Sequence, residues 1–100
     1  MVDVVVVTGG GDVVQRLGAD ARTLSSALET ARRLSYAMLR DIDPYGDTVF
    51  NRLQITLFLS QWHTLVQEAG LAEHSAARAV ARMAEFVRDN PHHYLKFEGD

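Results

Sequence analysis

Residues 48–69 read TVFNRLQITLFLSQWHTLVQEA, and this stretch decides the expected fold. When the residues are placed about 100° apart, as on a helix, the apolar side chains fall on two separate arcs. The narrower arc holds Phe50, Leu53 and Leu57. A helix with two apolar faces has to be covered from two sides, by its own chain or by a partner. The broader arc holds Ile55, Phe58, Leu59, Trp62, Leu65, Val66 and Ala69.

Two further helices are predicted, one before this segment and one after it. Residues 20–41 and residues 72–89 both place apolar residues at alternating steps of three and four, the pattern of an amphipathic helix. Pro44 disfavours helical geometry at the residue before it, so the first helix should stop near Asp41. Gly70 is expected to close the middle helix as a left-handed cap.

The two ends of the chain predict strands. Residues 2–8 are rich in β-branched valine, and residues 93–98 alternate in polarity. We expect these two strands to pair with each other; the alternative is that one end is frayed. Asp12 is interpreted as the cap of a short helical turn, although residues 12–17 could instead return as the second strand of a hairpin. The predicted fold class is mainly α: one domain over residues 1–100, built as a three-helix bundle with short N- and C-terminal β-strands.

Composition narrows the possible functions. The chain has 100 residues, 47% of them hydrophobic, which suits a domain that folds without cross-links. It contains no cysteine, so a thiolate nucleophile and a disulfide framework are excluded. The net charge of −3 argues against the basic patch that nucleic-acid binding requires, and no apolar run approaches the roughly 20 residues that span a bilayer. The first residues also lack the basic start of a secretory signal. We therefore expect a cytoplasmic protein that binds neither nucleic acid nor a membrane.

Known chemical motifs are incomplete in this sequence. The glycine run after the first valines has Gly9 and Gly11 at two positions of a dinucleotide fingerprint, but Val14 stands where the third glycine is required. The four histidines show no metal-binding spacing, and no serine has the context of a hydrolase nucleophile. The sequence therefore predicts no catalytic residue, no cofactor and no metal ligand.

The segment from Asp41 to Asp47 concentrates three carboxylates around Tyr45. Its spacing resembles the start of a calcium-binding loop, but Arg52 stands where the loop needs its bidentate carboxylate. In one interpretation Asp47 caps the following helix and the other two carboxylates are solvated. In the other, the segment is an acidic contact loop for a basic partner, or a weak cation site.

Asn51 is the other residue that draws attention. On the helical projection it falls within the broader apolar arc, where an amide needs hydrogen-bond partners or its burial costs about 1–3 kcal/mol. It either satisfies a nearby backbone group from the first turn or faces a groove and contacts a partner. The candidate partner-binding residues are thus Asp41, Asp43, Tyr45, Asp47 and Asn51. Trp62 is interpreted first as a core anchor and second as an interface residue.

Three functions are compatible with these patterns. The favoured one is a small protein-binding module of the immunity, antitoxin or adaptor kind, which uses the acidic loop and a helix face to bind another protein. The acidic loop would suit a basic partner. The second is a homo-oligomeric structural domain, for example a homodimer, in which a copy covers the surplus apolar face. The third, less favoured, is a small enzyme or ligand-binding protein with a pocket between the 48–69 helix and the termini, near Asn51, His93 and Tyr94.

Overall fold

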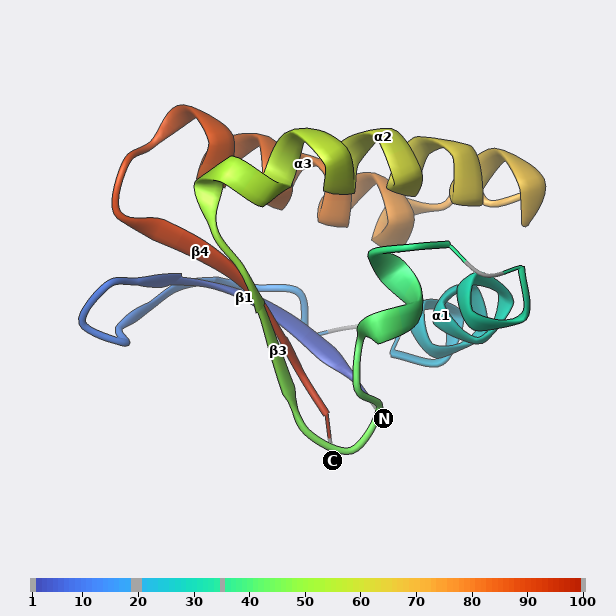
Figure 1. Ribbon diagram of the computed structural model, residues 1–100, viewed down its shortest axis with the longest axis horizontal. Coiled ribbons are helices and arrows are strands. Elements are labelled where there is room, and N and C mark those ends of the chain that lie inside the picture. Colours follow the sequence, from blue (N-terminus) through green and yellow to red (C-terminus); the bar gives the residue numbers. More distant parts are fainter. Residues whose placement is uncertain (1, 19–20, 35, 100) are drawn as a thin grey trace.

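Figure 1 shows the computed structural model of the chain, in which residues 2–18, 21–34 and 36–99 are described. The strands and helices of these residues follow one another as β1 (Asp3–Thr8), β2 (Val13–Arg16), α1 (Ala21–Arg33), a short 3-10 helix η1 (Leu39–Asp41), β3 (Asp47–Phe50), α2 (Arg52–Glu68), α3 (Ser75–Asp89) and β4 (His93–Glu98). In Figure 1, helices α2 and α3 run side by side across the top, above the sheet, and α1 lies below their right-hand half, to the right of the strands.

The four strands form one antiparallel sheet in the order β2-β1-β4-β3. The expected pairing of the two terminal strands is confirmed, because β1 and β4 run side by side from the Asp3–Glu98 pair to the Thr8–His93 pair. These two strands are the centre of the sheet. The first and last strands of the fold therefore lie side by side, and β2 and β3 form the edges of the sheet.

The predicted fold class is wrong. The chain is not a mainly α three-helix bundle with minor strands but an α+β fold, with three α-helices packed on a four-stranded sheet in the described residues. The two strands that sequence reasoning did not assign, β2 and β3, have four residues each. Segments this short carry too few alternations for their period to be distinguished from a turn.

The β2 strand takes the hairpin alternative rather than the helical turn at Asp12. The Thr8 amide donates to the Asp12 carbonyl oxygen at 2.9 Å, and Gly11 adopts φ +91°, a left-handed conformation that favours glycine. The pairing shifts by one residue between Val6 and Val7, which is a β-bulge next to the turn. Because the shift lies where the hairpin begins, β2 shows no regular alternation in the sequence.

The helix predicted over residues 20–41 is shorter than expected. Helix α1 ends at Arg33, and the predicted first residue, Asp20, lies outside the described residues. The chain then turns into η1, where the Gln61 side-chain oxygen accepts hydrogen bonds from the Met38 amide at 3.0 Å and from the Leu39 amide at 3.3 Å. These bonds replace the helical partners that the two amides would otherwise need, so the backbone can leave the helix here. The apolar spacing in the sequence continues past Arg33 although the helix ends there.

The other two helices also begin later than predicted. Helix α2 starts at Arg52 rather than residue 48, because the residues before it belong to the edge strand β3. Helix α3 starts at Ser75 rather than residue 72. The left-handed cap at Gly70 is confirmed: its φ is +71°, and the next amide, that of Leu71, returns to the Val66 carbonyl oxygen at 2.9 Å.

The core lies between the helices and one face of the sheet. Alternate strand residues point into it, with Val4 and Val6 from β1 and Leu95 and Phe97 from β4. Aromatic rings connect the layers: Phe58 of α2 lies 5.2 Å from Phe50, 5.8 Å from Phe97 and 5.9 Å from Trp62, measured between ring centroids. The broader apolar arc of α2 faces this core, and its six buried members are Ile55, Phe58, Leu59, Trp62, Leu65 and Val66.

Trp62 is buried, and its indole Nε1 donates to the Ala77 carbonyl oxygen of α3 at 3.0 Å. It is therefore the core anchor that the sequence favoured. In the described part of the chain, none of the helices is both long enough and apolar enough to cross a membrane.

Candidate interaction surface

The outward side of α2 carries no formal charge over four turns. Arg52 begins the helix and Glu68 ends it, and between them the sequence contains no aspartate, glutamate, lysine or arginine. The exposed residues on this stretch are Leu53, Gln54, Thr56, Leu57, Ser60, His63, Thr64 and Gln67. The outer surfaces of the other two helices differ: α1 exposes Glu29, Arg32 and Arg33, and α3 exposes Arg78, Arg82 and Arg88.

Two leucines stand on this uncharged surface. Leu53 is 90% exposed and Leu57 is 51% exposed. They are four residues apart, so on a helix they are direct neighbours. Continuing in helical steps, Ser60 and Thr64 follow on the same side of α2. The stripe of Leu53, Leu57, Ser60 and Thr64 is called the outer stripe below.

The second apolar arc predicted for this segment is thus divided by the structure. Phe50 lies on β3 and packs in the core, 4% exposed, whereas Leu53 and Leu57 remain uncovered by the described chain. The requirement that the segment be covered from two sides is therefore met on one side only. The other side departs from an ordinary charged surface.

The acidic loop is held in a defined shape. The Asp43 side chain accepts a hydrogen bond from the Tyr45 amide at 2.8 Å, and the Asp43 amide donates to the Thr48 hydroxyl at 3.0 Å. This arrangement leaves the Tyr45 side chain 82% exposed at the tip. The loop therefore presents an aromatic ring on a fixed backbone.

The remaining two carboxylates of the loop point to different neighbours. Asp47 lies at the start of β3, with its oxygen 3.4 Å from Lys96 Nζ of β4. Asp41 is in η1, where its oxygen lies 3.9 Å from Arg40 Nε. Asp47 does not cap the middle helix, contrary to one of the two interpretations, because a strand separates them. The three aspartates do not converge on a common point, and no metal-holding group of three acidic or histidine residues occurs in the described chain.

Asn51 caps α2 and does not belong to the acidic loop. Its side-chain oxygen accepts from the Gln54 amide at 3.0 Å, and the Gln54 side chain accepts from the Asn51 amide at 2.8 Å, which completes a capping box. The residue is exposed, not buried as the helical projection suggested, because it precedes the helix. Residues 48–50 of β3 separate it from Asp47 at the end of the loop, which places the two residues roughly 13 Å apart at the usual rise of a strand.

The face of the sheet that points away from the core carries a row of ion pairs. Arg16 Nη1 lies 2.8 Å from an Asp3 oxygen and 3.0 Å from a Glu98 oxygen, and Lys96 Nζ lies 3.5 Å from the other Glu98 oxygen. Together with Asp47, these residues place alternating charges across all four strands. With two cations, Arg16 and Lys96, against three carboxylates, the row has a formal charge of only −1.

Within this row, Asp3 is the most strongly held carboxylate. Burial raises its pKa, but hydrogen bonds from the Gly18 amide at 2.9 Å, the Arg16 guanidinium and the Val4 amide at 2.8 Å oppose that effect. Their combined result is a pKa below the usual value for aspartate. The row therefore fastens the two edges of the sheet to its centre.

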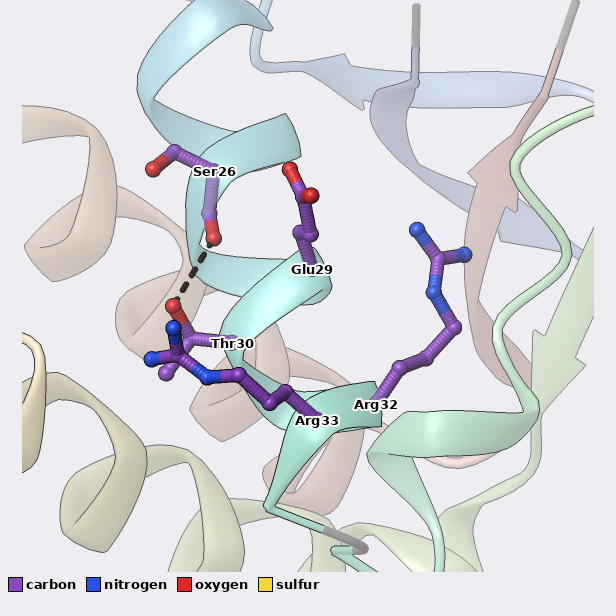
Figure 2. Close-up of a pocket in the computed structure, with 5 residues that line it drawn as sticks. All are labelled: Ser26, Glu29, Thr30, Arg32 and Arg33. Atoms are coloured by element: carbon purple, nitrogen blue, oxygen red, sulfur yellow. Dashed lines mark hydrogen bonds between the residues drawn. The ribbon is translucent and has the colours of Figure 1, made fainter.

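A broad hollow of about 690 Å³ lies on the outside of α1 (Figure 2). Its lining is Ser26, Glu29, Thr30, Arg32 and Arg33, all from one helix. In Figure 2 the Arg33 side chain lies back along the helix beside Thr30, whereas Arg32 points away from it. The Thr30 hydroxyl donates to the Ser26 carbonyl oxygen at 3.1 Å and so serves its own helix. Because no group from a second element closes the hollow, it is an open surface rather than a ligand pocket.

The pocket expected between the middle helix and the termini is not formed by its candidate residues. Asn51 is committed to the capping box. His93 Nδ1 lies 3.0 Å from the Pro91 carbonyl oxygen in the turn before β4, and its ring stacks edge-on against Phe86. Tyr94, one residue further along a strand, points to the opposite face of the sheet from His93. The three side chains therefore do not converge on one cavity.

Sequence reasoning identified Leu53 and Leu57 as apolar residues that need a cover, but it overlooked that the surface around them is uncharged. The signal was present as fifteen consecutive residues without a formal charge. The ion-pair row could not be predicted from the sequence, because it depends on the register of four strands. Comparison of the chain with protein-family models, with curated proteins and with solved structures finds no match. The function of this protein is therefore inferred from its own surface.

Proposed function

We propose that this chain is a small protein-binding domain and that the outward side of α2 is its contact surface. The observation that carries the proposal is the uncharged outer stripe, with Leu53 almost fully exposed. The cores of protein interfaces are depleted of charged residues, whereas lysine, arginine, glutamate and aspartate are mostly found on the ordinary exposed surface. Two adjacent leucines on four uncharged turns fit the first description.

The outward side of α2 is already ordered in the chain by itself. Six residues on the inner side of α2 are buried, and the capping box fixes its first turn. A partner therefore does not have to order this helix, which lowers the entropic cost of association. An apolar face on a preformed helix is suited to packing against another helix or into an apolar groove.

The loop from Asp41 to Asp47 supplies a second contact region in this proposal. Tyr45 combines a large contact area with few rotatable bonds, and the loop backbone is held by Asp43 and Thr48. Negative charge around it favours a partner with basic residues at the matching position, because complementary charges speed encounter. Since β3 separates the loop from α2, the two regions would contact different parts of a partner.

A photo-cross-linking amino acid at position 57, introduced into the full chain in its native cell, tests the proposal. We expect a covalent adduct at this position and none with the same probe at Arg32, which is exposed on α1. Adding Leu53→Asp to the position 57 probe should abolish the adduct. No adduct at position 57, or equal adducts at both positions, contradicts the proposal.

A further inference from the structure

We infer that the groove between β2 and α3 binds an extended, acidic peptide segment, which adds to the sheet as a fifth strand beside β2. This site goes beyond the contact proposed for α2, because none of its residues belongs to that helix. Three observations carry the inference: a backbone edge that no strand pairs with, a groove with walls from two elements, and a lining that holds cations without carboxylates.

The backbone of Arg16 is open on the outer edge of β2. The Leu17 amide donates to the Val4 carbonyl oxygen at 2.8 Å, and Gln15 is the partner of Val6 in the register of the two strands. In an antiparallel pair, residues that bond to the neighbouring strand alternate with residues whose N–H and C=O point away from it. The N–H and C=O of Arg16 therefore point away from β1, to a side where no strand of the described chain lies.

This edge lacks most of the features that keep another strand from pairing. The bulge in β2 lies at its hairpin end, away from Arg16. The Arg16 side chain does not cover the edge, because it reaches inward to Asp3 and Glu98 on the central strands. The residues toward the hairpin, Val13 and Val14, are 48% and 47% exposed. Edges are commonly protected by bulges, proline or outward charges, so an open edge beside exposed valines is a template for a further strand.

A groove of about 380 Å³ lies beside the same edge. One wall comes from β2 with the residue after it, and the other wall comes from α3; the lining is Gln15, Arg16, Leu17, Ala79, Arg82 and Met83. Unlike the hollow on α1, the groove is therefore bounded by two elements that are distant in sequence. Gln15 and Leu17 pair with Val6 and Val4, which face the core, so both side chains lie on the α3 side of the sheet.

An added antiparallel strand would exchange two hydrogen bonds with the backbone of Arg16. The antiparallel direction is expected because the existing pairs of strands are all antiparallel and this pairing is slightly more stable per residue. The peptide residue opposite Arg16 then has its side chain on the open face of the sheet, which carries the ion-pair row. The peptide residues before and after it point into the groove, so these are the positions that the groove selects.

The lining of the groove selects an acidic side chain at one of these positions. It holds two cations, Arg16 and Arg82, and no carboxylate. Arg16 is already paired with two carboxylates of the ion-pair row, whereas Arg82 is exposed and forms no ion pair with any described residue. A carboxylate in the groove gives Arg82 a partner of opposite charge. Apart from Gln15 the rest of the lining is apolar, so the other groove-facing position suits an aliphatic side chain.

The edge strands of a second copy do not fit this description. Strand β2 contains no carboxylate. Strand β3 contains Asp47, but Gly46 bonds to Gly99 after β4, so by alternation the backbone of Asp47 points to the open edge of β3. If that edge paired with β2, the Asp47 side chain would lie on the open face of the sheet and not in the groove. A dimer of the chain alone that Arg82→Glu disrupts would contradict this argument and overturn the inference.

Binding of the synthetic peptide Thr-Glu-Thr-Val-Thr-Glu-Thr, blocked at both ends, to the isotope-labelled full chain is the first test. One face of this peptide, when extended, presents valine between two glutamates. We expect a dissociation constant of about 0.1–1 mM, since only two backbone hydrogen bonds and one exposed ion pair are gained. Amide exchange at Arg16 should slow at least threefold, whereas the Gln15 amide, which already faces β1, should not change. No binding up to about 5 mM, or unchanged exchange at Arg16, overturns the inference.

Methylation of peptide nitrogens separates strand addition from binding through side chains alone. In the antiparallel arrangement the threonines on either side of the valine direct their N–H groups at β2, whereas the glutamates direct theirs at solvent. Methylating both of these threonine nitrogens should weaken binding at least tenfold, and methylating both glutamate nitrogens should change it less than twofold. Equal losses would overturn strand addition, and the reverse pattern would overturn the antiparallel direction.

A charge exchange tests the role of Arg82. Arg82→Glu should weaken binding of the glutamate peptide at least fivefold and strengthen binding of a peptide in which lysine replaces both glutamates. Arg32→Glu is the matched control, because it makes the same change of charge on an exposed residue in the last turn of α1. Equal effects of the two substitutions would show that only the total charge matters and would overturn the assignment of Arg82.

The groove and the outer stripe can be tested independently. Leu57→Asp should leave the affinity for the glutamate peptide unchanged, and Arg82→Glu should leave the adduct of the position 57 probe unchanged. Peptide binding without any adduct at position 57 would support the groove and contradict the proposed contact of α2. If Leu57→Asp weakens peptide binding as much as Arg82→Glu, the groove is not a separate site and the inference is overturned.

Discussion

The Gly99 amide donates a hydrogen bond to the Gly46 carbonyl oxygen at 2.7 Å, which fastens the residue after β4 to the loop before β3. The two backbones are so close that a Cβ atom on Gly99 would lie 2.5 Å from both the nitrogen and the oxygen of Gly46. The acidic loop is therefore positioned by the end of the chain as well as by its own Asp43.

Gly99→Ala should destabilise the protein by about 1–3 kcal/mol, because backbone has to move to admit the methyl group. Urea unfolding followed by circular dichroism measures this change. Gly10→Ala is the matched control, since a Cβ there would meet the nearest atom, the Thr8 hydroxyl oxygen, at 3.9 Å. Equal stability of Gly99→Ala and the wild type would show that the contact between Gly99 and the loop is not a constraint on the fold.

Asn51→Ala should lower the free energy of unfolding by about 1 kcal/mol, since it removes the side chain that caps α2. Asn51→Ser keeps an oxygen at the cap and should recover most of that loss. Neither substitution should weaken the association of α2 once differences in stability are taken into account. If Asn51→Ser keeps the stability but lowers affinity for a partner, then Asn51 is a contact residue after all.

The helices and the central pair of strands were largely predictable from the sequence, whereas the two edge strands of the sheet were not. The buried stripes of α2 and α3 repeat over several turns, so many residues support one period. The edge strands β2 and β3 have four residues each, and what makes them strands is their pairing with β1 and β4. The single partner of β3 is distant in sequence, because its pair with β4 spans about half the chain. Local pattern carries no information about such a pairing.

The structural placements expected for the candidate residues were wrong for a related reason, whereas their role in binding a partner stays a prediction. Asn51 was placed on the apolar arc because the helix was assumed to begin before it, and a start at Arg52 turns it into a cap. Asp43 and Asp47 were grouped by their proximity in sequence, but the turn at Asp43 and the pairing of Asp47 with Lys96 give them different neighbours. By contrast, Leu53 and Leu57 depend only on helical geometry, and their common side was predicted correctly.

Trp62→Phe should destabilise the protein by about 1–3 kcal/mol. The substitution removes the donor to the Ala77 carbonyl oxygen and leaves a void beside Phe58, whose ring is stacked on the indole. Because Trp62 is the only tryptophan, the variant has to be followed by circular dichroism rather than by fluorescence. An unchanged unfolding midpoint would mean that neither the hydrogen bond from Trp62 to Ala77 nor the packing of the indole contributes to stability.

The ion-pair row on the open face of the sheet predicts a loss of stability in acid that depends on Asp3. Its pKa is lower in the folded protein than the ordinary 3.8, so the folded state favours the charged form. The stabilisation is therefore complete well above pH 3.8 and is lost as the pH falls through 3.8 toward the lower folded value. Asp3→Asn should flatten the dependence of the unfolding free energy on pH in this window, measured by urea titrations between about pH 6 and 2.5.

Part of the slope should remain in the Asp3→Asn variant, because the hydrogen bond from Arg88 also lowers the pKa of Asp89. Asp41→Asn, which removes an exposed carboxylate outside the row, is the control. If it flattens the slope as much as Asp3→Asn, the row is not the source of the acid sensitivity.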